Sequence, residues 1–314
     1  MNRLLVVANP AAGRGRVRRR WTQVAEALAV AGIEFRVAHT REPLEAARLA
    51  EGAAGRYAAV VAVGGDGTVH EVVNGLMRIP AEARPALGVV PLGSGDDFAK
   101  MIALAGPGAP RPQWRAAVTA IARGTPRVHD VGVIRDGEGG EHYFANGMDV
   151  GFGAHVARHV AEVPRWLTGV GAYLAAIART MLRYPTLDVR LQFDDAPPFA
   201  HRSTIAAIMN GRCFGGSFWA CPEARADDGL LDVMLADVVS RTQILRLVPK
   251  LMRGRHTGEP VLRMLRARRV VIESDEPLVV EADGELPPIR ARRLEIGVLP
   301  GALRVLGYGP PRTD

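Results

Sequence analysis

Glycines surround a single acid in the stretch from Gly64 to Thr68, which reads Gly-Gly-Asp-Gly-Thr. Glycine lets the backbone approach an anion closely, and the free N–H groups at the start of a helix face negative charge. The stretch therefore predicts a phosphate-binding turn. Asp66 has no reason to meet a bare phosphate, so it would hold a magnesium ion, position a ribose or take a proton from a hydroxyl. A tight turn with a solvated aspartate is the plain alternative.

Two other glycine turns have the same character. The segment 9–16 reads NPAAGRGR, and it is not a Walker loop because no Gly-Lys-Ser/Thr follows. Asn9, Gly13 and the arginines of this segment are nevertheless suited to line a nucleotide. The segment 91–100 reads PLGSGDDFAK and places Asp96 and Asp97 directly beside a phosphate-compatible turn.

Two acidic stretches of the second half also carry chemistry. The run 227–230 reads Asp-Asp-Gly-Leu, which usually means a hairpin turn, although carboxylate and carbonyl oxygens in a tight turn also hold hard cations. The run 281–285 reads Glu-Ala-Asp-Gly-Glu after an apolar strand. Either Asp283 or Glu285 is a candidate general base, provided that two domains face each other across a cleft.

The elements that must position these residues are strands and helices in alternation. Each glycine turn follows a short apolar run, and helical stripes of apolar residues follow the turns, which is the pattern of a parallel α/β sheet. The carboxyl ends of such strands converge where open α/β sheets bind ligands. The predicted strands are Leu4–Ala8, Ile33–Ala38, 58–63 and Leu87–Val90, and the predicted helices are 18–31, one starting at Thr40 with Leu44, Ala47 and Leu49, and one starting at Thr68.

The pattern of apolar and polar residues changes near Arg127, where we place a domain boundary. Strand-like alternation with Gly, Pro and Asp turns then predominates, which predicts a largely antiparallel second domain. One helical stripe interrupts it within 166–182, and core packing is its default interpretation, with a membrane-facing or lid helix as the alternative. The predicted strands are 128–134, 142–146, 187–193, 203–209, 231–236, 270–274, 278–282 and 294–299.

Composition restricts the class of protein. The 314 residues suit two domains or one large domain, and the two cysteines, Cys213 and Cys221, are expected to be reduced, half-buried hydrophobes of a cytoplasmic protein. No targeting segment or membrane span is predicted. The net charge of +7 would suit anionic lipid, nucleotide phosphate or nucleic acid, but no nucleic-acid recognition motif is present.

The motifs occur in the order found in the diacylglycerol kinase catalytic-domain family. The chain resembles this family, which includes bacterial soluble lipid kinases and sphingosine kinases and is distantly related to NAD kinases, through NPAAG, GGDGTVHEVVNGL, PLGSGDDFAK, DDGLLDV and DGE. The resemblance implies an α/β + β fold, with an N-terminal α/β nucleotide-binding domain (1–126 plus about 301–314) and a C-terminal β-sandwich domain for the lipid (127–300). It also implies an active site between the domains and a final segment, 302–308, that returns to the first domain.

The resemblance also implies site residues. It places ATP against the three glycine turns and one residue of the second βα unit, namely Asn9, Pro10, Ala11, Ala12, Gly13, Thr40, Gly64, Gly65, Asp66, Gly67, Thr68, Val69, His70, Gly93, Ser94 and Asp97. A structural Mg²⁺ would bind the Asp228 side chain and the carbonyls of Arg225 and Leu230. The proton acceptor maps to Glu285 or Asp283, or to Asp66 by analogy with some members, and the choice stays open.

Three residues depart from the family pattern, and Asp96 is the serious departure. The segment 93–100 usually reads Gly-Thr-Gly-Asn-Asp-Phe-Ala-Arg in the family, whereas Ser94, Asp96 and Lys100 stand in place of Thr, Asn and Arg here. Asp96 adds a negative charge near the expected triphosphate. It would weaken ATP binding, recruit a further magnesium ion, or point harmlessly into solvent.

The expected function is that of an ATP- and Mg²⁺-dependent lipid kinase that phosphorylates a hydroxyl of a diacylglycerol-like lipid. Its expected partner is a lipid at the inner face of the membrane, reached by transient peripheral contact from the cytoplasm; no nucleic acid is expected, and a homodimer is compatible with the sequence. The alternatives are a kinase of a soluble hydroxyl substrate such as NAD and a non-catalytic nucleotide-binding regulator.

Overall fold

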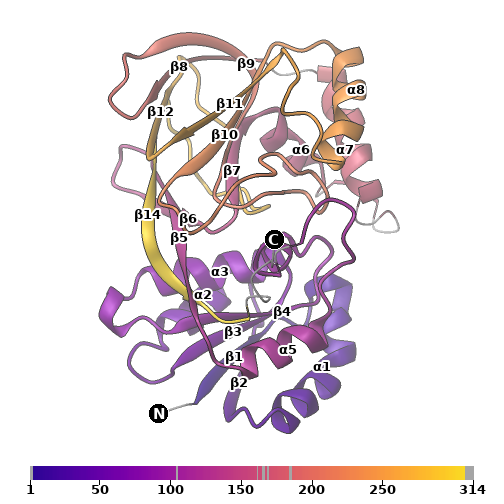
Figure 1. Ribbon diagram of the computed structural model, residues 1–314, viewed down its shortest axis with the longest axis vertical. Helices are drawn as coiled ribbons and strands as arrows, with labels where there is room; N and C mark the ends of the chain where they lie inside the picture. Colours follow the sequence, from indigo (N-terminus) through magenta and orange to yellow (C-terminus); the bar gives the residue numbers. More distant parts are fainter. Residues whose placement is uncertain are drawn as a thin grey trace. The chain divides into compact units, whose positions relative to one another are not determined.

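The computed structural model describes residues 3–103, 105–160, 162–164, 167, 170–183 and 186–307. It divides into two compact units, of which the first holds the chain up to His129 and the segment from Gly301, and the second holds Asp130–Pro300 (Figure 1). The boundary predicted near Arg127 lies at the start of β5 (Arg127–Arg135), one of the strands that pass from one unit to the other.

The first unit is built on a parallel sheet with the order β2-β1-β3-β4. Its strands are β1 (Leu4–Ala8), β2 (Phe35–His39), β3 (Ala59–Gly64) and β4 (Ala86–Pro91), so the four predicted strands are present. The last residues of β14 (Arg293–Val305) extend this sheet in parallel, with Val305 opposite Leu87. The chain moves outward from β1 in opposite directions to β2 and to β3, so the switch point of the sheet lies between β1 and β3.

Helices cover both faces of this sheet (Figure 1). Alternate strand residues such as Val6 and Val61 pack into one core with α1 (Ala12–Val30) and α5 (Trp114–Ala122). The intervening residues, such as Val60, are equally buried and face the side of α2 (Glu45–Glu51) and α3 (Asp66–Met77), as the period of two requires. The shorter helices η1 (Ala81–Ala83) and α4 (Asp97–Ile102) complete the unit.

The three predicted helix starts in this unit differ from the structure, and the helix predicted from Thr68 begins at Asp66. The second helix begins at Glu45 and not at Thr40, because Leu44 adopts a left-handed conformation with φ +64° and is exposed. The first helix includes three left-handed residues, Gly13, Arg14 and Gly15, so its regular right-handed part starts at Arg16 and not at Arg18. In α1 and α2 the errors arise because left-handed residues form a turn where the apolar pattern of the sequence would allow a helix.

The second unit is a mainly antiparallel β structure. One path of paired strands has the order β11-β10-β9-β8-β12-β14, while β7 joins β9 to β13 and β5 pairs with β6. Its strands are β6 (Glu141–Phe144), β7 (Gly147–Gly151), β8 (Leu187–Phe193), β9 (Phe199–Met209), β10 (Leu231–Asp237), β11 (Leu262–Ala267), β12 (Arg269–Glu273) and β13 (Val280–Ala282). The eight predicted strands each overlap one of the observed strands, and β7 and β11 were not predicted.

Strands β9 and β10 are buried on both faces. Ile208 and Val233 contribute to a core shared among the strands, whereas their neighbours Ala207 and Met234 pack against helices. Those helices are α6 (Phe152–Val160), α7 (Val170–Arg183) and α8 (Arg241–Met252). Helix α8 begins with a capping box between Ser240 and Gln243. The Ser-x-x-Gln spacing is a helix-start signal that is visible in the sequence.

The predicted core stripe of α7 is only partly correct. The stripe was predicted from Leu167, Val170, Leu174, Ile177 and Met181. Ile177 is buried and Met181 packs against the core, but Leu174 is 40% exposed. The helix therefore packs through a neighbouring face that includes Ala176 and Thr180. Trp166, the first residue of the predicted segment, lies outside the described residues, as does Tyr308 at the end of the predicted final segment.

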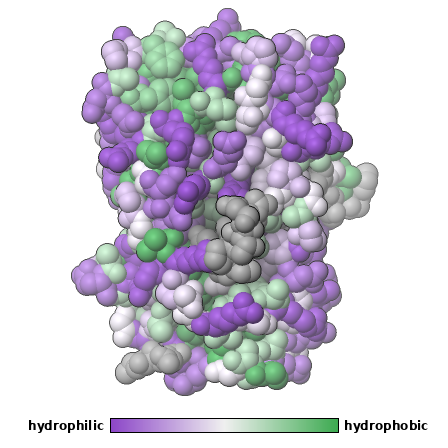
Figure 2. Space-filling model, viewed as in Figure 1, coloured by the Kyte–Doolittle hydropathy of each residue, from purple (hydrophilic) through white to green (hydrophobic). Residues whose placement is uncertain are grey.

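Within the described ranges, no helix is both long enough and apolar enough to cross a membrane. On the face drawn in Figure 2, hydrophilic side chains predominate and hydrophobic ones form small separate groups. Both cysteines are free thiols, and both are fully buried where half-burial was expected.

Packing of α3 on α2 gives a stability prediction. A Cβ on Gly75 of α3 would lie 2.1 Å from the Ala47 carbonyl oxygen of α2, whereas a Cβ on Gly52, at the end of α2, would meet nothing closer than 3.4 Å. Both residues are helical, so backbone conformation does not distinguish them. We expect Gly75→Ala to lower the free energy of unfolding by about 1–3 kcal/mol in urea titrations. Gly52→Ala is the matched control with no loss, and equal midpoints for the two variants would contradict the packing.

Candidate active site

The turn after β1 is joined to the turn after β3 by a side-chain hydrogen bond. Asn9 Nδ2 donates to Thr68 Oγ1 at 3.1 Å, and Asn9 Oδ1 accepts from the backbone N–H of Ala11 at 3.1 Å. Since β1 and β3 flank the switch point of the sheet, the hydrogen bond spans the position where α/β sheets bind ligands. Pro10 and Ala12 complete this turn, and Thr40 follows β2 beside it, with its N–H donating to the Ala8 carbonyl at 3.0 Å.

The turn after β3 approaches the turn after β4 backbone to backbone. A Cβ on Gly65 would lie 2.9 Å from the Cα of Gly93, and one on Gly93 would lie 2.4 Å from the Cα of Gly65. Gly13 is equally close to the turn after β4, because a Cβ on Gly13 would lie 2.0 Å from the Leu92 carbonyl oxygen. These glycines are therefore required by close packing, and the structure brings the three predicted glycine turns together.

Helix α3 starts directly at this junction. Gly65 is its N-cap in an extended conformation, and Asp66 and Gly67 form the first turn. The Val69 side chain is buried, so this residue belongs to the core. His70 is half-buried, and its Nε2 lies 3.4 Å from Asn74 Nδ2. The N-terminal N–H groups and the helix dipole provide favourable interactions for an anion at this point.

Asp96 holds the turn after β4 in place. Its Oδ1 accepts from the Gly93 N–H at 2.8 Å, and its backbone is left-handed with φ +57°. The side chain is buried, so the expectation that it points into solvent is wrong. Burial raises the pKa of its carboxyl group. Two arginines steady the same turn, because Arg16 donates to the Gly93 carbonyl at 2.6 Å and Arg111 donates to the Ser94 carbonyl.

Three carboxyl groups crowd this site. Asp66 accepts from the Phe98 N–H at 3.2 Å, and Asp97 pairs with Lys100 at 2.8 Å. Burial raises the pKa of Asp66 to about 8, with further increases from the charges of Asp97 and Asp96. The nearby cations therefore do not offset the burial and mutual repulsion of these carboxyl groups, and a divalent cation is the kind of ligand that would stabilise their charged forms.

No three His, Cys, Asp or Glu side chains among the described residues converge into a ready-made metal site. Asp66 and Asp97 therefore fit a magnesium ion only in the way that Mg²⁺ is commonly held in kinases. In that arrangement one or two carboxylates bind the ion, and water and substrate phosphates supply the remaining ligands.

The two candidate bases of the acidic turn at 281–285, Asp283 and Glu285, have different surroundings. Asp283 Oδ2 accepts from the Ala145 N–H at 2.9 Å, and Asp283 Oδ1 accepts from the N–H groups of Asn146 at 2.9 Å and Gly147 at 3.1 Å. The Asp283 carboxylate thus binds a backbone segment. Glu285, two residues later, is exposed. The two candidate bases thus differ in environment, since Asp283 is engaged by three backbone N–H groups and Glu285 lies at an exposed position.

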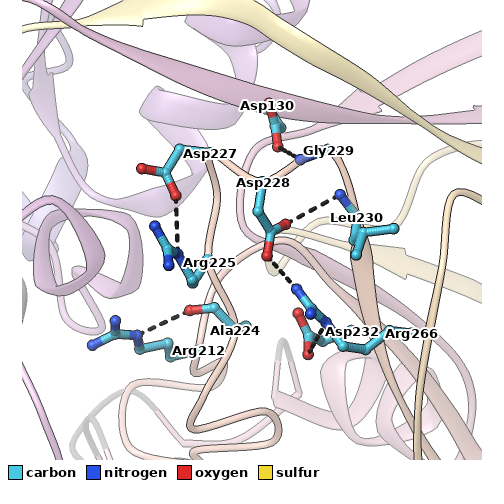
Figure 3. Close-up of polar contacts among 10 residues, drawn as sticks. All are labelled: Asp130, Arg212, Ala224, Arg225, Asp227, Asp228, Gly229, Leu230, Asp232 and Arg266. Atoms are coloured by element: carbon cyan, nitrogen blue, oxygen red, sulfur yellow. Dashed lines mark hydrogen bonds and ion pairs between the residues drawn. The ribbon is translucent and has the colours of Figure 1, made fainter.

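The loop at 225–230 forms a charged cluster with β10 and β11 (Figure 3). Asp228 Oδ1 accepts from the Leu230 N–H at 3.2 Å, while Asp228 Oδ2 pairs with Arg266, whose Nε lies 3.4 Å from Asp232 Oδ1. Asp130 Oδ2 accepts from the Gly229 N–H at 2.7 Å and so fixes the turn. Burial raises the pKa of Asp232 to about 6, and Asp232 Oδ2 has no hydrogen-bond partner.

Sequence reasoning missed several residues of these sites. Arg111 lies in an irregular stretch without a motif, and Arg266 reaches the loop at 225–230 only through the pairing of β10 with β11. Asp130 occurs in an alternating strand whose pattern indicates nothing beyond a strand. For Arg16 there was a signal, since it belongs to the NPAAGRGR segment.

Comparisons with known proteins agree with this architecture. The diacylglycerol kinase catalytic domain matches residues 3–134, and the YegS C-terminal NAD kinase beta sandwich-like domain matches residues 146–307. A probable lipid kinase, YegS-like, of Chromohalobacter salexigens is 34% identical, with 87% of this chain and 84% of that protein covered. A diacylglycerol kinase of Mycobacterium tuberculosis is 33% identical, with 86% and 82% covered.

The structural comparison extends over both units. A crystal structure of a Bacillus anthracis protein, proposed to be a diacylglycerol kinase, has a TM-score of 0.77 and 25% identity and covers 98% of each chain. The fold and the matched domains are those of a kinase. The chain belongs to the diacylglycerol kinase catalytic-domain family, whose relatives here are named lipid kinases and diacylglycerol kinases.

The two acids of the 283–285 segment should respond differently to amide substitution. In Asp283→Asn, the amide NH₂ would face a backbone N–H that the carboxylate now binds, so one buried donor loses its acceptor. We expect the free energy of unfolding to fall by about 1–3 kcal/mol. Glu285→Gln, at an exposed position, should stay within about 0.5 kcal/mol of the unsubstituted protein. Chemical denaturation measures both values, and equal stability of the two variants would contradict the positioning role of Asp283.

Proposed function

We propose that this protein is an ATP- and Mg²⁺-dependent lipid kinase that transfers the γ-phosphate to a hydroxyl of a diacylglycerol-like lipid. The observation that carries the proposal is the junction of three glycine turns with Asp66 and Asp97 at the switch point of the parallel sheet. Family membership supports the kinase reaction, and the names of the relatives support a lipid acceptor.

The phosphates of ATP would be bound by backbone N–H groups of the glycine turns and of the start of α3. Asn9 and Thr68 fix two of these turns relative to each other, and Asp96 with Arg16 fixes the third. Asp66 and Asp97 would hold Mg²⁺, which supplies charge neutralisation for the transferred phosphoryl group. The chain contributes mainly by positioning, because phosphoryl transfer needs little covalent assistance.

Glu285 is the proposed proton acceptor. Its carboxylate would take the proton from the lipid hydroxyl, while Asp283 keeps the turn in register through three backbone hydrogen bonds. Asp66 is less suited to this role, because burial and, to a smaller extent, the neighbouring Asp97 and Asp96 raise its pKa, an environment that favours cation binding.

The loop at 225–230 fits a structural cation in its donor chemistry. Asp228 and the carbonyls of Arg225 and Leu230 are oxygen donors within one turn, and the unpartnered Asp232 oxygen nearby marks negative charge that Arg266 does not fully balance. Mg²⁺ held there would stabilise the loop and take no part in bond making.

An apolar cavity of about 80 Å³ in the second unit supports an acyl-chain site. Helices α6, α7 and α8 and strands β9 and β10 surround it, and its lining is almost entirely apolar. Its lining includes Val156, Tyr173, Ile177, Phe218, Ile244 and Leu247. A hydrocarbon chain gains free energy in such a cavity by leaving water.

The surface of α7 and α8 supports contact with an anionic bilayer. Leu182 at the end of α7 and Leu245 on α8 are 76% and 62% exposed, and Arg241 links them by donating to the Leu182 carbonyl at 3.2 Å. Arg246 is exposed next to Leu245, and the helix contains no acidic residue. Exposed leucines beside arginines are the composition of a peripheral membrane-binding surface.

The reaction is tested with labelled ATP, magnesium and mixed micelles of diacylglycerol, monoacylglycerol, phosphatidylglycerol, sphingosine and ceramide, with NAD as a soluble acceptor. We expect a diacylglycerol-like lipid to be labelled, EDTA to abolish the labelling, and Glu285→Gln to lower kcat by about 10²–10⁴-fold. Labelling of NAD alone would identify a soluble substrate. Binding of ATP without any labelling would identify a regulator, and either result would refute the proposal.

The membrane surface is tested by co-sedimentation with vesicles of neutral phosphatidylcholine and of phosphatidylcholine with phosphatidylglycerol. We expect Arg246→Glu to weaken binding to the anionic vesicles by at least about fivefold, from about 1 kcal/mol per charge. The double variant Leu182→Ser, Leu245→Ser should weaken binding to both vesicles. Val30→Ser, an exposed valine of the first unit, is the control. Equal effects of the control and the double variant would refute this surface.

A further inference from the structure

Two acids face each other in the interior of the second unit. Asp149 on β7 and Glu281 on β13 are direct partners in the antiparallel pairing, and both side chains are buried. Buried carboxyl groups are rarely found without a cation or a set of donors. Neither residue belongs to the proposed phosphate or cation sites.

Each acid binds the backbone of a different segment. Asp149 Oδ1 accepts from the Ala154 N–H in the first turn of α6 at 2.6 Å, and Glu281 Oε1 accepts from the Gly284 N–H in the turn that carries Glu285. Among the described residues, no N–H group or hydroxyl donates to the buried Asp149 Oδ2, and the Glu281 carboxyl group is the side chain that interacts with Asp149. Gly153 leaves room for Asp149 Oδ2, since a Cβ on Gly153 would lie 2.5 Å from this oxygen.

A single proton between the two carboxyl groups would satisfy this oxygen. Two adjacent carboxylates in a buried site cannot both ionise, so one proton is retained at neutral pH. Burial raises the pKa of Asp149 to about 7 and that of Glu281 well above its ordinary value. The negative charge of Asp283 acts on Glu281 in the same direction.

We propose that Asp149 and Glu281 share one proton, and that this hydrogen bond fixes the turn bearing Glu285 against the start of α6. They are positioning residues, and their importance for catalysis rests on the proposed role of Glu285. Because α6 also lines the apolar cavity, the shared proton connects the helix at the cavity to the turn that bears the base.

The shared proton makes the stability of the second unit dependent on pH. Both acids have raised pKa values in the folded protein, so folding takes up a proton. The free energy of unfolding therefore falls as pH rises from the ordinary carboxyl value of about 4 through 7 and above. An amide in place of either acid supplies a permanent N–H donor and removes this loss.

The test is the melting temperature between pH 5 and 9 for the unsubstituted protein, Glu281→Gln and Asp149→Asn. We expect similar values at pH 5 and a higher Tm for both amide variants at pH 9. Asp66, Asp96 and Asp232 contribute to the pH dependence of all three proteins, so the difference between curves isolates the pair. Asp194→Asn is the control, because Asp194 binds the N–H groups of Arg268 and Arg269 at another turn of the same unit. Parallel curves for all variants would overturn the shared proton.

Kinetics test the positioning role separately. Asp149→Leu removes the partner of Glu281, and we expect kcat to fall by about 10²-fold through misplacement of Glu285, with KM for ATP unchanged. Asp149→Asn should restore kcat and keep it up to pH 9. An Asp149→Leu variant with full kcat would overturn the positioning role. If the unsubstituted protein phosphorylates no lipid, the proposed function fails while the melting curves still decide the shared proton.

Discussion

The first unit depends on the contact between the backbones of Gly65 and Gly93. Two turns can approach within van der Waals distance only where neither carries a side chain, and here a Cβ on either residue would overlap the other chain. This contact brings the N-terminus of α3, Asp66 and the 93–97 turn to the same edge of the sheet. Gly13 adds the first turn by packing on the Leu92 carbonyl. The proposed anion site thus rests on close packing of glycines.

A second feature of the molecule is the clustering of acidic side chains. Acids cluster around Asp66, around Asp228 and at the Asp149–Glu281 pair, and each cluster has a different counterbalance. Lys100, Arg16 and Arg111 lie at the first, Arg266 lies at the second, and a shared proton is proposed for the third.

The sequence predicted the parallel sheet and the three phosphate turns because strand, glycine turn and helix follow one another locally. It also predicted most strands of the second unit from alternation. It did not predict β7, since Gly147 and Gly151 at its ends weaken the strand pattern, or the exposed Leu174, because a stripe does not reveal which face finds a partner. The roles of Asp283 and Asp149 depend on contacts with Asn146 and Glu281 far along the chain, and no local pattern encodes such contacts.

Strand β14 gives the chain an unusual order of assembly. Its last residues lie beside β4, where the Leu306 N–H donates to the Leu87 carbonyl at 2.7 Å and Arg84 donates to the Ala302 carbonyl. The sheet that carries the phosphate turns therefore has an open edge at β4 until the ribosome has made residues more than two hundred positions further on. During synthesis this edge is available to other strands. The first unit, although it comes first in the sequence, is among the last parts of the protein to be closed.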